Sequence, residues 1–257
     1  YLYLLAFAFV ACHNPSEQKE SAKEQLTNYV NPFIGTDGTG NTYPGAMTPF
    51  GMVQLSPDIG IPGWDRISGY FYPDSIITGF SHTHLSGTGA GDLYDVLLMP
   101  TNSRFNERIE ANNRLPFSYF SHQHETATAG YYSVDLLSYG IKAELTATPR
   151  VGVQRYTFPK DEQSKITVDL GYSINWDKPT ETYLKVVDNT TLEGYRFSTG
   201  WARNQKVYFV IKLSKPFVRY ELVEETIEGK QQAGQLVLHY PTEEGDQVVV
   251  KTALSMH

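Results

Sequence analysis

The amino-acid sequence predicts an all-β fold, an antiparallel β-sandwich with long Gly/Pro-rich loops and few or no long helices. One reason is a series of short segments after Tyr131 in which apolar and polar residues alternate, as in strands with one buried face. Composition agrees, because 18 Tyr and 13 Phe beside 21 Gly and 14 Pro are typical of strands joined by tight turns. No long amphipathic helix is convincing.

Eight strands are expected after the midpoint of the chain, at 131–137, 141–148, 151–158, 165–170, 191–198, 207–213, 235–240 and 247–254. The triplets Ser138-Tyr139-Gly140 and Thr148-Pro149-Arg150 predict hairpin turns between the first three of them. Residues 29–95 are dense in Gly and Pro, which predicts loops around short strands.

Charge and cysteine content exclude several classes of function. Lys and Arg total 21 against 28 Asp and Glu, so the formal net charge is −7 and nucleic acid is not an expected partner. A mean hydropathy of −0.35 excludes a multispan membrane protein. The single cysteine, Cys12, leaves no disulfide framework or thiolate metal site within one chain.

The start of the chain resembles a bacterial lipoprotein signal. Residues 1–11 form an apolar run that is too short to span a bilayer, which takes about 20 residues, but suits the hydrophobic region of a signal peptide. Cys12 follows as the expected lipidation site, and residues 13–27 are polar, like a solvated tether. The predicted organisation is a truncated signal peptide at 1–11, a lipidated cysteine and tether at 12–28, and a β-sandwich at 29–257. The alternative for the first segment is a buried N-terminal strand.

The densest cluster of polar and glycine residues is GFSHTHLSGTGAGD, residues 79–92. His82 and His84 are two apart, so on a strand they would point the same way and could grip one ion or one polyol. We keep three interpretations: a ligand-binding loop, a structural loop whose histidines bond backbone groups, and a metal hydrolase site built on His82, His84, Asp92 and Asp95.

A second candidate is Gly63-Trp64-Asp65-Arg66, followed by an aromatic stretch that includes Tyr70. The face of Trp64 suits a sugar ring, and Asp65 can hold hydroxyl groups in a fixed geometry. The alternative is an aromatic core patch with one surface ion pair. The adjacent His124 and Glu125 would point to opposite faces of a strand, so we expect a structural role for them.

The order of several segments resembles the N-terminal domain of glycoside hydrolase family 92, the bacterial exo-acting α-mannosidases. The resemblance rests on NPFIGT, YPGAMTPFGMVQLSPD, GYFYPDSIITGFSHTHLSGTG, DVLLMP, GYYSVDL, IKAELTATPRVGVQRYTFP and ITVDL, which together run from about residue 29 to the end. It implies a supersandwich-like β-sandwich that packs on a C-terminal (α/α)6 barrel, with the active site between them.

The resemblance also implies an inverting, calcium-dependent mechanism whose acid, base and calcium ligands belong to the barrel. No catalytic residue and no metal ligand is therefore expected in this chain, which ends in a strand-like run and is expected to be a fragment of a longer protein, inactive alone. Trp64, Asp65, His82 and His84 match the loop motifs of the family pattern and are expected to contact a mannose-containing glycan. The expected location is the bacterial cell envelope, through the lipid on Cys12 alone.

One further hypothesis from another class stays open beside the metal hydrolase. The chain could be a stand-alone carbohydrate-binding surface lipoprotein, which would need Trp64 and nearby aromatic side chains but no partner domain.

Overall fold

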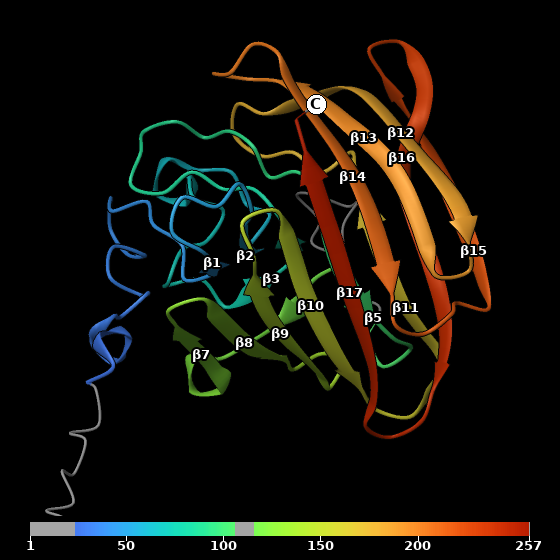
Figure 1. Cartoon of the computed structure of the whole chain (residues 1–257), viewed down its shortest axis with the longest axis horizontal. Helices are drawn as coiled ribbons and strands as arrows, with labels where there is room; N and C mark the ends of the chain where they lie inside the picture. The colour runs from blue at the N-terminus through green and yellow to red at the C-terminus, as the bar shows by residue number, and fades with distance from the viewer. Residues whose placement is uncertain (1–23, 106–115, 257) are drawn as a thin grey trace, which may run out of the picture.

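The protein is seen here in a computed structural model that describes residues 24–105 and 116–256 (Figure 1). Two antiparallel sheets lie face to face, and a small two-stranded sheet stands beside them. Figure 1 shows the first part of the chain gathered as loops on one side of the molecule, with the long strands on the other. The predicted antiparallel β-sandwich is therefore confirmed.

The seven-stranded sheet contains, in spatial order, β1 (Ala46–Met47), β2 (Gln54–Asp58), β4 (Gly79–Ser81), β5 (Leu97–Thr101), β11 (Asp161–Asp169), β16 (Lys230–Thr242) and β15 (Arg219–Ile227). The eight-stranded sheet contains β12 (Lys178–Asp188), β13 (Thr191–Thr199), β14 (Gln205–Leu213), β17 (Asp246–Ser255), β10 (Val151–Phe158), β9 (Ile141–Ala147), β8 (Tyr131–Leu136) and β7 (Glu125–Thr128). The small sheet pairs β3 (Ile76–Ile77) with β6 (Ser118–Tyr119).

Helical structure among the described residues is limited to short 3₁₀ turns, η1 (Leu26–Tyr29), η2 (Trp64–Arg66) and η4 (His122–His124). Over residues 24–105 and 116–256, no helix has the length and apolar character needed to cross a membrane. The predicted signal segment and Cys12 lie outside the described residues.

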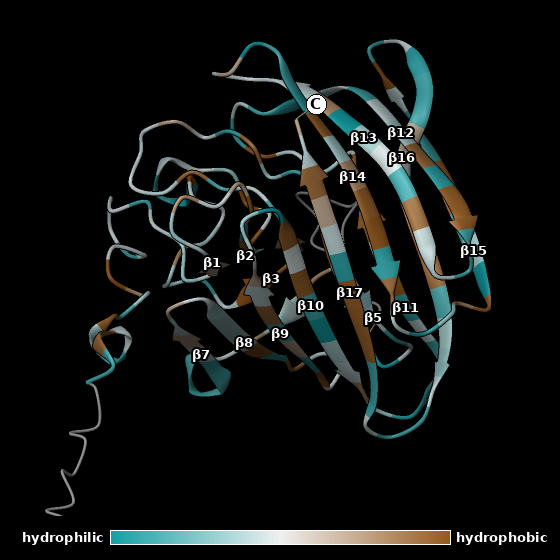
Figure 2. Ribbon diagram, in the orientation of Figure 1, coloured by the Kyte–Doolittle hydropathy of each residue, from teal (hydrophilic) through white to brown (hydrophobic). Residues whose placement is uncertain are grey.

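The core lies between the two large sheets because alternate residues of each strand turn inward. In β14 every second position from Gln205 to Leu213 is buried, and Figure 2 shows apolar residues in both β14 and β17. Leu55 and Phe80 of one sheet join Tyr156 and Val250 of the other in a single buried cluster. Burial of this apolar surface is the main stabilising contribution, about 25 cal/mol per Å².

All eight predicted strands are present, but the prediction missed strands where the alternation fails. β5 is buried at every position, so it has no polar face. β15 is an edge strand whose residues are exposed on both faces except near its end, so it has no buried face to reveal a period of two. β12 lies at the other sheet's edge and contains Pro179, which is tolerated there because an edge strand has unpaired positions.

Four loops meet at one end of the sandwich, and we call them the loop cluster: residues 59–75, 82–96, 170–177 and 200–204. Hydrogen bonds join them, from the Gly63 N–H to Asn175 Oδ1, from the Trp176 N–H to the Gly91 carbonyl, and from the Ala202 N–H to Asp92 Oδ2. Segments more than a hundred residues apart in the chain thus form one surface.

The close spacing between β12, β13 and β14 gives a test of the sheet register. A Cβ atom at Gly194 would lie 2.1 Å from the Tyr183 carbonyl oxygen and 2.6 Å from Phe209 Cζ. We expect Gly194→Ala to lower the free energy of unfolding by about 1–3 kcal/mol, the usual cost of overpacking, in a urea titration of the chain.

The matched control is Gly63→Ala, because Gly63 has extended backbone and its nearest neighbour would be Arg66 Nη1 at 3.5 Å. That change is expected to stay within about 0.5 kcal/mol of the wild type. Equal unfolding midpoints for the two variants would contradict the register.

Candidate functional site

Trp64 lies on the outer surface of the loop cluster, in the 3₁₀ turn η2. Its side chain is 59% exposed, and its indole edge lies beside Gly89, where a Cβ atom would be 3.3 Å from Trp64 Cη2. The core-patch alternative therefore does not hold for Trp64, whereas it does for Tyr70, which is fully buried. A large exposed indole beside a glycine presents an apolar surface to solvent.

Asp65 and Arg66 form the polar border of this surface. Arg66 donates from Nε and Nη2 to both oxygens of Asp74, at 2.8 and 2.9 Å, and from Nη1 to Asp65 Oδ2 at 3.1 Å. Its hydrogen bonds to Asp74 are the main cause that raises the pKa of Arg66 above its ordinary value. The guanidinium also lies 4.7 Å from the centre of the Phe71 ring. Arg66 is thus held on three sides, while the Asp65 side chain remains 43% exposed.

Asn175 supports the Trp64 turn from a distant part of the sequence. Its Oδ1 accepts the Gly63 N–H at 3.1 Å, and its Nδ2 donates to the Arg66 carbonyl at 3.4 Å and to the Tyr94 hydroxyl at 3.2 Å. Asn175 has left-handed backbone with φ of 56°, a conformation that asparagine adopts more readily than most residues. The first two bonds fix both ends of the η2 turn, and the third holds the Asn175 side chain itself.

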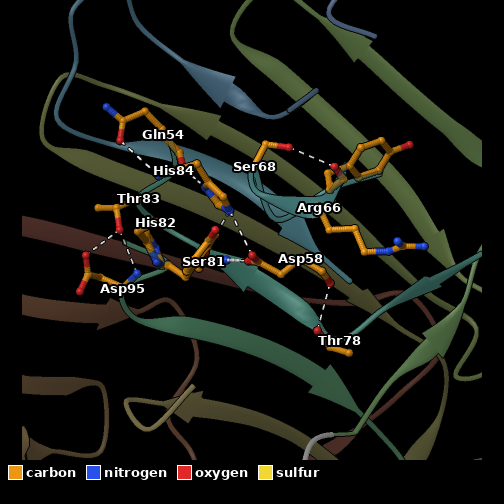
Figure 3. A network of polar contacts seen from close by, with 12 residues as sticks. Gln54, Asp58, Arg66, Ser68, Thr78, Ser81, His82, Thr83, His84 and Asp95 are labelled. Carbon is orange, nitrogen blue, oxygen red and sulfur yellow. Dashed lines mark hydrogen bonds and ion pairs between the residues drawn. The ribbon is translucent and has the colours of Figure 1, made fainter. Parts of the chain in front are cut away.

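His84 lies beneath this surface in a buried polar network (Figure 3). Its Nδ1 donates to the Gln54 carbonyl at 2.7 Å, because a carbonyl oxygen can only accept. Its Nε2 lies 3.0 Å from Ser81 Oγ and 3.2 Å from Asp58 Oδ1. Asp58 Oδ2 in turn accepts the Ser81 N–H at 2.9 Å, so the histidine links β2 and β4 to the loop that follows.

His82 is also fully buried, but its ring faces the opposite sheet. Nδ1 donates to the Val96 carbonyl at 2.7 Å, and Nε2 accepts from Gln154 Nε2 at 3.2 Å, an arrangement that a neutral ring satisfies. Burial is the largest cause that lowers the pKa of His82 to about 4. Every ring nitrogen of both histidines has a protein partner, which matches the structural interpretation of this loop.

The metal-hydrolase interpretation required His82, His84, Asp92 and Asp95 to converge, and they do not. Asp95 accepts from Arg196, Thr83 and Gln205, and Asp92 accepts from the Ala202 N–H. Across the described part of the chain, no group of three or more His, Cys, Asp or Glu side chains is arranged as metal ligands. A group of three carboxylates that could share a calcium ion is likewise not found among the described residues.

His124 and Glu125 diverge, as the sequence predicted. Glu125 is buried and accepts from the Tyr70 hydroxyl at 3.0 Å, the Tyr132 hydroxyl at 2.5 Å and His122 Nδ1 at 2.8 Å. His124 instead pairs with Asp135 at 3.3 Å. Both residues thus contact β8, Glu125 through Tyr132 and His124 through Asp135.

Sequence reasoning missed two exposed aromatic residues of the loop cluster, Trp176 and Trp201. They are 46% and 73% exposed, and with Trp64 they account for all three tryptophans of the chain. It also missed Arg196, which is completely buried. The two tryptophans had only a local sequence signal, their Asn, Asp and Gly neighbours in predicted loops. That signal did not show that both line one depression.

The chain resembles known proteins in sequence and in fold. Residues 29–255 match the family model described as the glycosyl hydrolase family 92 N-terminal domain. A family GH92 alpha-mannosidase from Bacteroides thetaiotaomicron, solved in complex with mannoimidazole, is 35% identical with a TM-score of 0.83, over 91% of this chain and 33% of that one. A family GH92 inverting mannosidase from Bacteroides thetaiotaomicron VPI-5482 is 26% identical with a TM-score of 0.70, over 90% of this chain and 31% of that one.

A curated relative, an uncharacterized secreted glycosidase from Arthroderma benhamiae, is 30% identical over 141 residues, which are 52% of this chain and 17% of the relative. The chain thus spans 33% or less of the length of the relatives named here.

The buried His82 predicts a loss of stability in acid. Its pKa is about 4 in the fold, against an ordinary value of 6.5, so the unfolded chain binds more protons between these values. The stabilisation is fully present above pH 6.5 and is lost as pH falls through 4; a shift of this size corresponds to about 3 kcal/mol.

We expect the free energy of unfolding, measured by urea titration from pH 7 to pH 4, to fall less steeply in His82→Gln, which cannot take up a proton. An unchanged slope in His82→Gln would contradict a neutral, buried His82.

Proposed function

The chain belongs to glycosyl hydrolase family 92, whose N-terminal domain it contains, and on this basis we propose that it is the substrate-binding and domain-docking part of an inverting, calcium-dependent exo-α-mannosidase that acts on mannose-containing glycans. Two mannosidases of the family share its fold over about nine-tenths of its length. The chain covers about a third of each, which leaves room in such a protein for a separate catalytic domain.

The exposed Trp64, fixed at the loop cluster beside Asp65, is the observation that carries the substrate-binding role. An indole face stacks on the C–H face of a pyranose, and a neighbouring carboxylate accepts hydrogen bonds from ring hydroxyls. Asn175 and Asp74 hold the turn in place before any ligand arrives, so little conformational entropy is lost on binding. In this role Trp64 orients the sugar and excludes water from one side of it.

His82 and His84 support the sugar-binding surface from below. They were expected to donate to sugar hydroxyls, but their nitrogens bond Val96, Gln154, Gln54, Ser81 and Asp58. We assign them the task of holding the 82–96 loop against β2 and β10. Trp64 and Asp65 then remain as the proposed sugar contacts.

The bond-breaking groups are assigned to a C-terminal (α/α)6 domain of the same polypeptide. An inverting glycosidase needs an acid and a base about 6.5–9.5 Å apart with a water between base and sugar. The buried carboxylates Asp58, Asp95 and Glu125 serve internal ion pairs and hydrogen bonds. Calcium, a hard cation that binds oxygen ligands, would be held by that domain and would orient sugar hydroxyls there.

The test of the substrate-binding role is Trp64→Ala in the natural polypeptide that carries this domain. Losing a central aromatic contact costs on the order of 2 kcal/mol, so we expect kcat/KM for α-mannobiosides to fall about tenfold to a hundredfold. Trp64→Phe should keep most of the activity, and Tyr220→Ala, an exposed tyrosine on the edge strand β15, should keep all of it.

Linkage-defined mannobiosides should be assayed with and without a calcium chelator. Activity that survives both Trp64→Ala and chelation would refute the proposed function, and so would hydrolysis by residues 29–257 alone.

We extend the proposal to location, with the lipid on Cys12 as the only membrane attachment at the bacterial cell envelope. The relative from Arthroderma benhamiae is a secreted glycosidase, which agrees with export. In bacterial cells that express the natural polypeptide, wild-type protein should incorporate a labelled fatty acid and sediment with membranes, whereas Cys12→Ser should do neither. Label in Cys12→Ser would contradict the assignment.

A further inference from the structure

An open depression lies on the loop cluster beside the Trp64 turn, between the end of β13 and the start of β12. It measures about 510 Å³ and is lined by Asn175, Trp176, Lys178, Thr199, Gly200 and Trp201. Small-molecule sites in proteins have volumes of about 300–1,000 Å³. The lining thus combines two exposed indole rings with the amide of Asn175, the ammonium of Lys178 and the hydroxyl of Thr199.

The Trp176 side of the depression is anchored by a buried ion pair. The Trp176 N–H donates to the Gly91 carbonyl at 2.9 Å, and the next residue, Asp177, pairs with the fully buried Arg196. Arg196 further donates to the Leu170 carbonyl at 3.0 Å and to the Tyr172 carbonyl at 2.8 Å, so the connection from β11 to β12 is held along its length. Trp176 therefore stands on a rigid segment although its ring is exposed.

The Trp201 side is anchored by Asp92. Asp92 Oδ2 accepts the Ala202 N–H at 2.8 Å, and a Cβ atom on Gly200 would lie 2.1 Å from Asp92 Oδ1, so the loop can lie this close only with glycine there. Asp92 is 2% exposed, and its Oδ1 has no hydrogen-bond partner among the described residues. Asp92 therefore lies behind the lining and holds Gly200 and Trp201 in place from the inside.

We propose that the Trp176–Trp201 depression is a second sugar-binding site, which takes pyranose residues of a mannose-containing glycan other than the one bound at Trp64. Aromatic faces stack on sugar C–H faces, and the Lys178 ammonium and the Thr199 hydroxyl can hydrogen-bond sugar hydroxyls. Asn175 joins the two places, because it lines the depression and also holds the Gly63 N–H next to Trp64. The choice of a mannose-containing ligand rests on the proposed function; the presence of a sugar site does not.

The direct test is affinity electrophoresis of the chain in gels that contain yeast mannan. Mannan should retard the wild-type chain. The dissociation constant for mannan should be at least tenfold higher for the double variant Trp176→Ala/Trp201→Ala. Trp176→Phe/Trp201→Phe should recover most of the retardation, since an aromatic face remains, and Tyr220→Ala should behave as wild type. Unfolding midpoints of all variants establish that each is folded.

Kinetics separate this proposal from the proposed function. In the natural polypeptide the double variant should raise KM for a mannotetraose at least fivefold, leave KM for a single-residue aryl α-mannoside unchanged, and leave kcat unchanged.

If the polypeptide hydrolyses no mannoside, the proposed function fails, while mannan retardation still decides the second site. The second site is overturned if mannan does not retard the wild-type chain, or if it retards the double variant equally, as it would if these tryptophans served only to contact another domain.

Discussion

One buried cation, the guanidinium of Arg196 on β13, connects the surface loops of this domain to the sheet beneath them. It bonds Asp95 and Asp177 as well as two backbone carbonyls. A buried charge is tolerated only when it is paired and hydrogen-bonded, and removing one partner leaves another charge stranded, which commonly costs 3–5 kcal/mol. The 82–96 loop and the segment before β12 are therefore obliged to meet at this point, and Trp176 takes its position from that meeting.

The loop cluster divides its polar and aromatic residues between two levels. His82, His84 and Asp92 lie inside. His84 bonds Gln54 of β2 and Ser81 of β4, His82 bonds Gln154 of β10, and Asp92 bonds the 200–204 loop. The tryptophans lie outside, on segments that these bonds hold still. Loops with little regular structure can then present a surface as rigid as a sheet, because their backbone groups and buried side chains find partners within the protein. This is the property that a sugar-binding wall requires, since sugars offer weak, directional contacts.

Particular residues show how far sequence reasoning reached. The strands after Tyr131 were predictable because one buried face produces a period of two, whereas β5 has two buried faces and most of β15 has none, so both lack that signal. Trp64 was found through its residue type and its Gly and Asp neighbours. The spacing of His82 and His84 pointed to a loop with many polar contacts. Spacing cannot say whether a histidine ring faces solvent or, as for His82, faces Gln154 on the opposite sheet.

By itself, the sequence determined the antiparallel β-sandwich, eight of its strands, the turns between β8, β9 and β10, and the family. These follow from local periodicity, from turn chemistry and from motif order, all of which lie along the chain. Only the tertiary structure decided that Trp176 and Trp201 line one depression, that Asn175 joins it to the turn of Trp64, that both histidines are internal, and that Arg196 is enclosed by Asp95 and Asp177. Those arrangements depend on which strands pair across more than a hundred residues, and that pairing is set by the packing of the whole core.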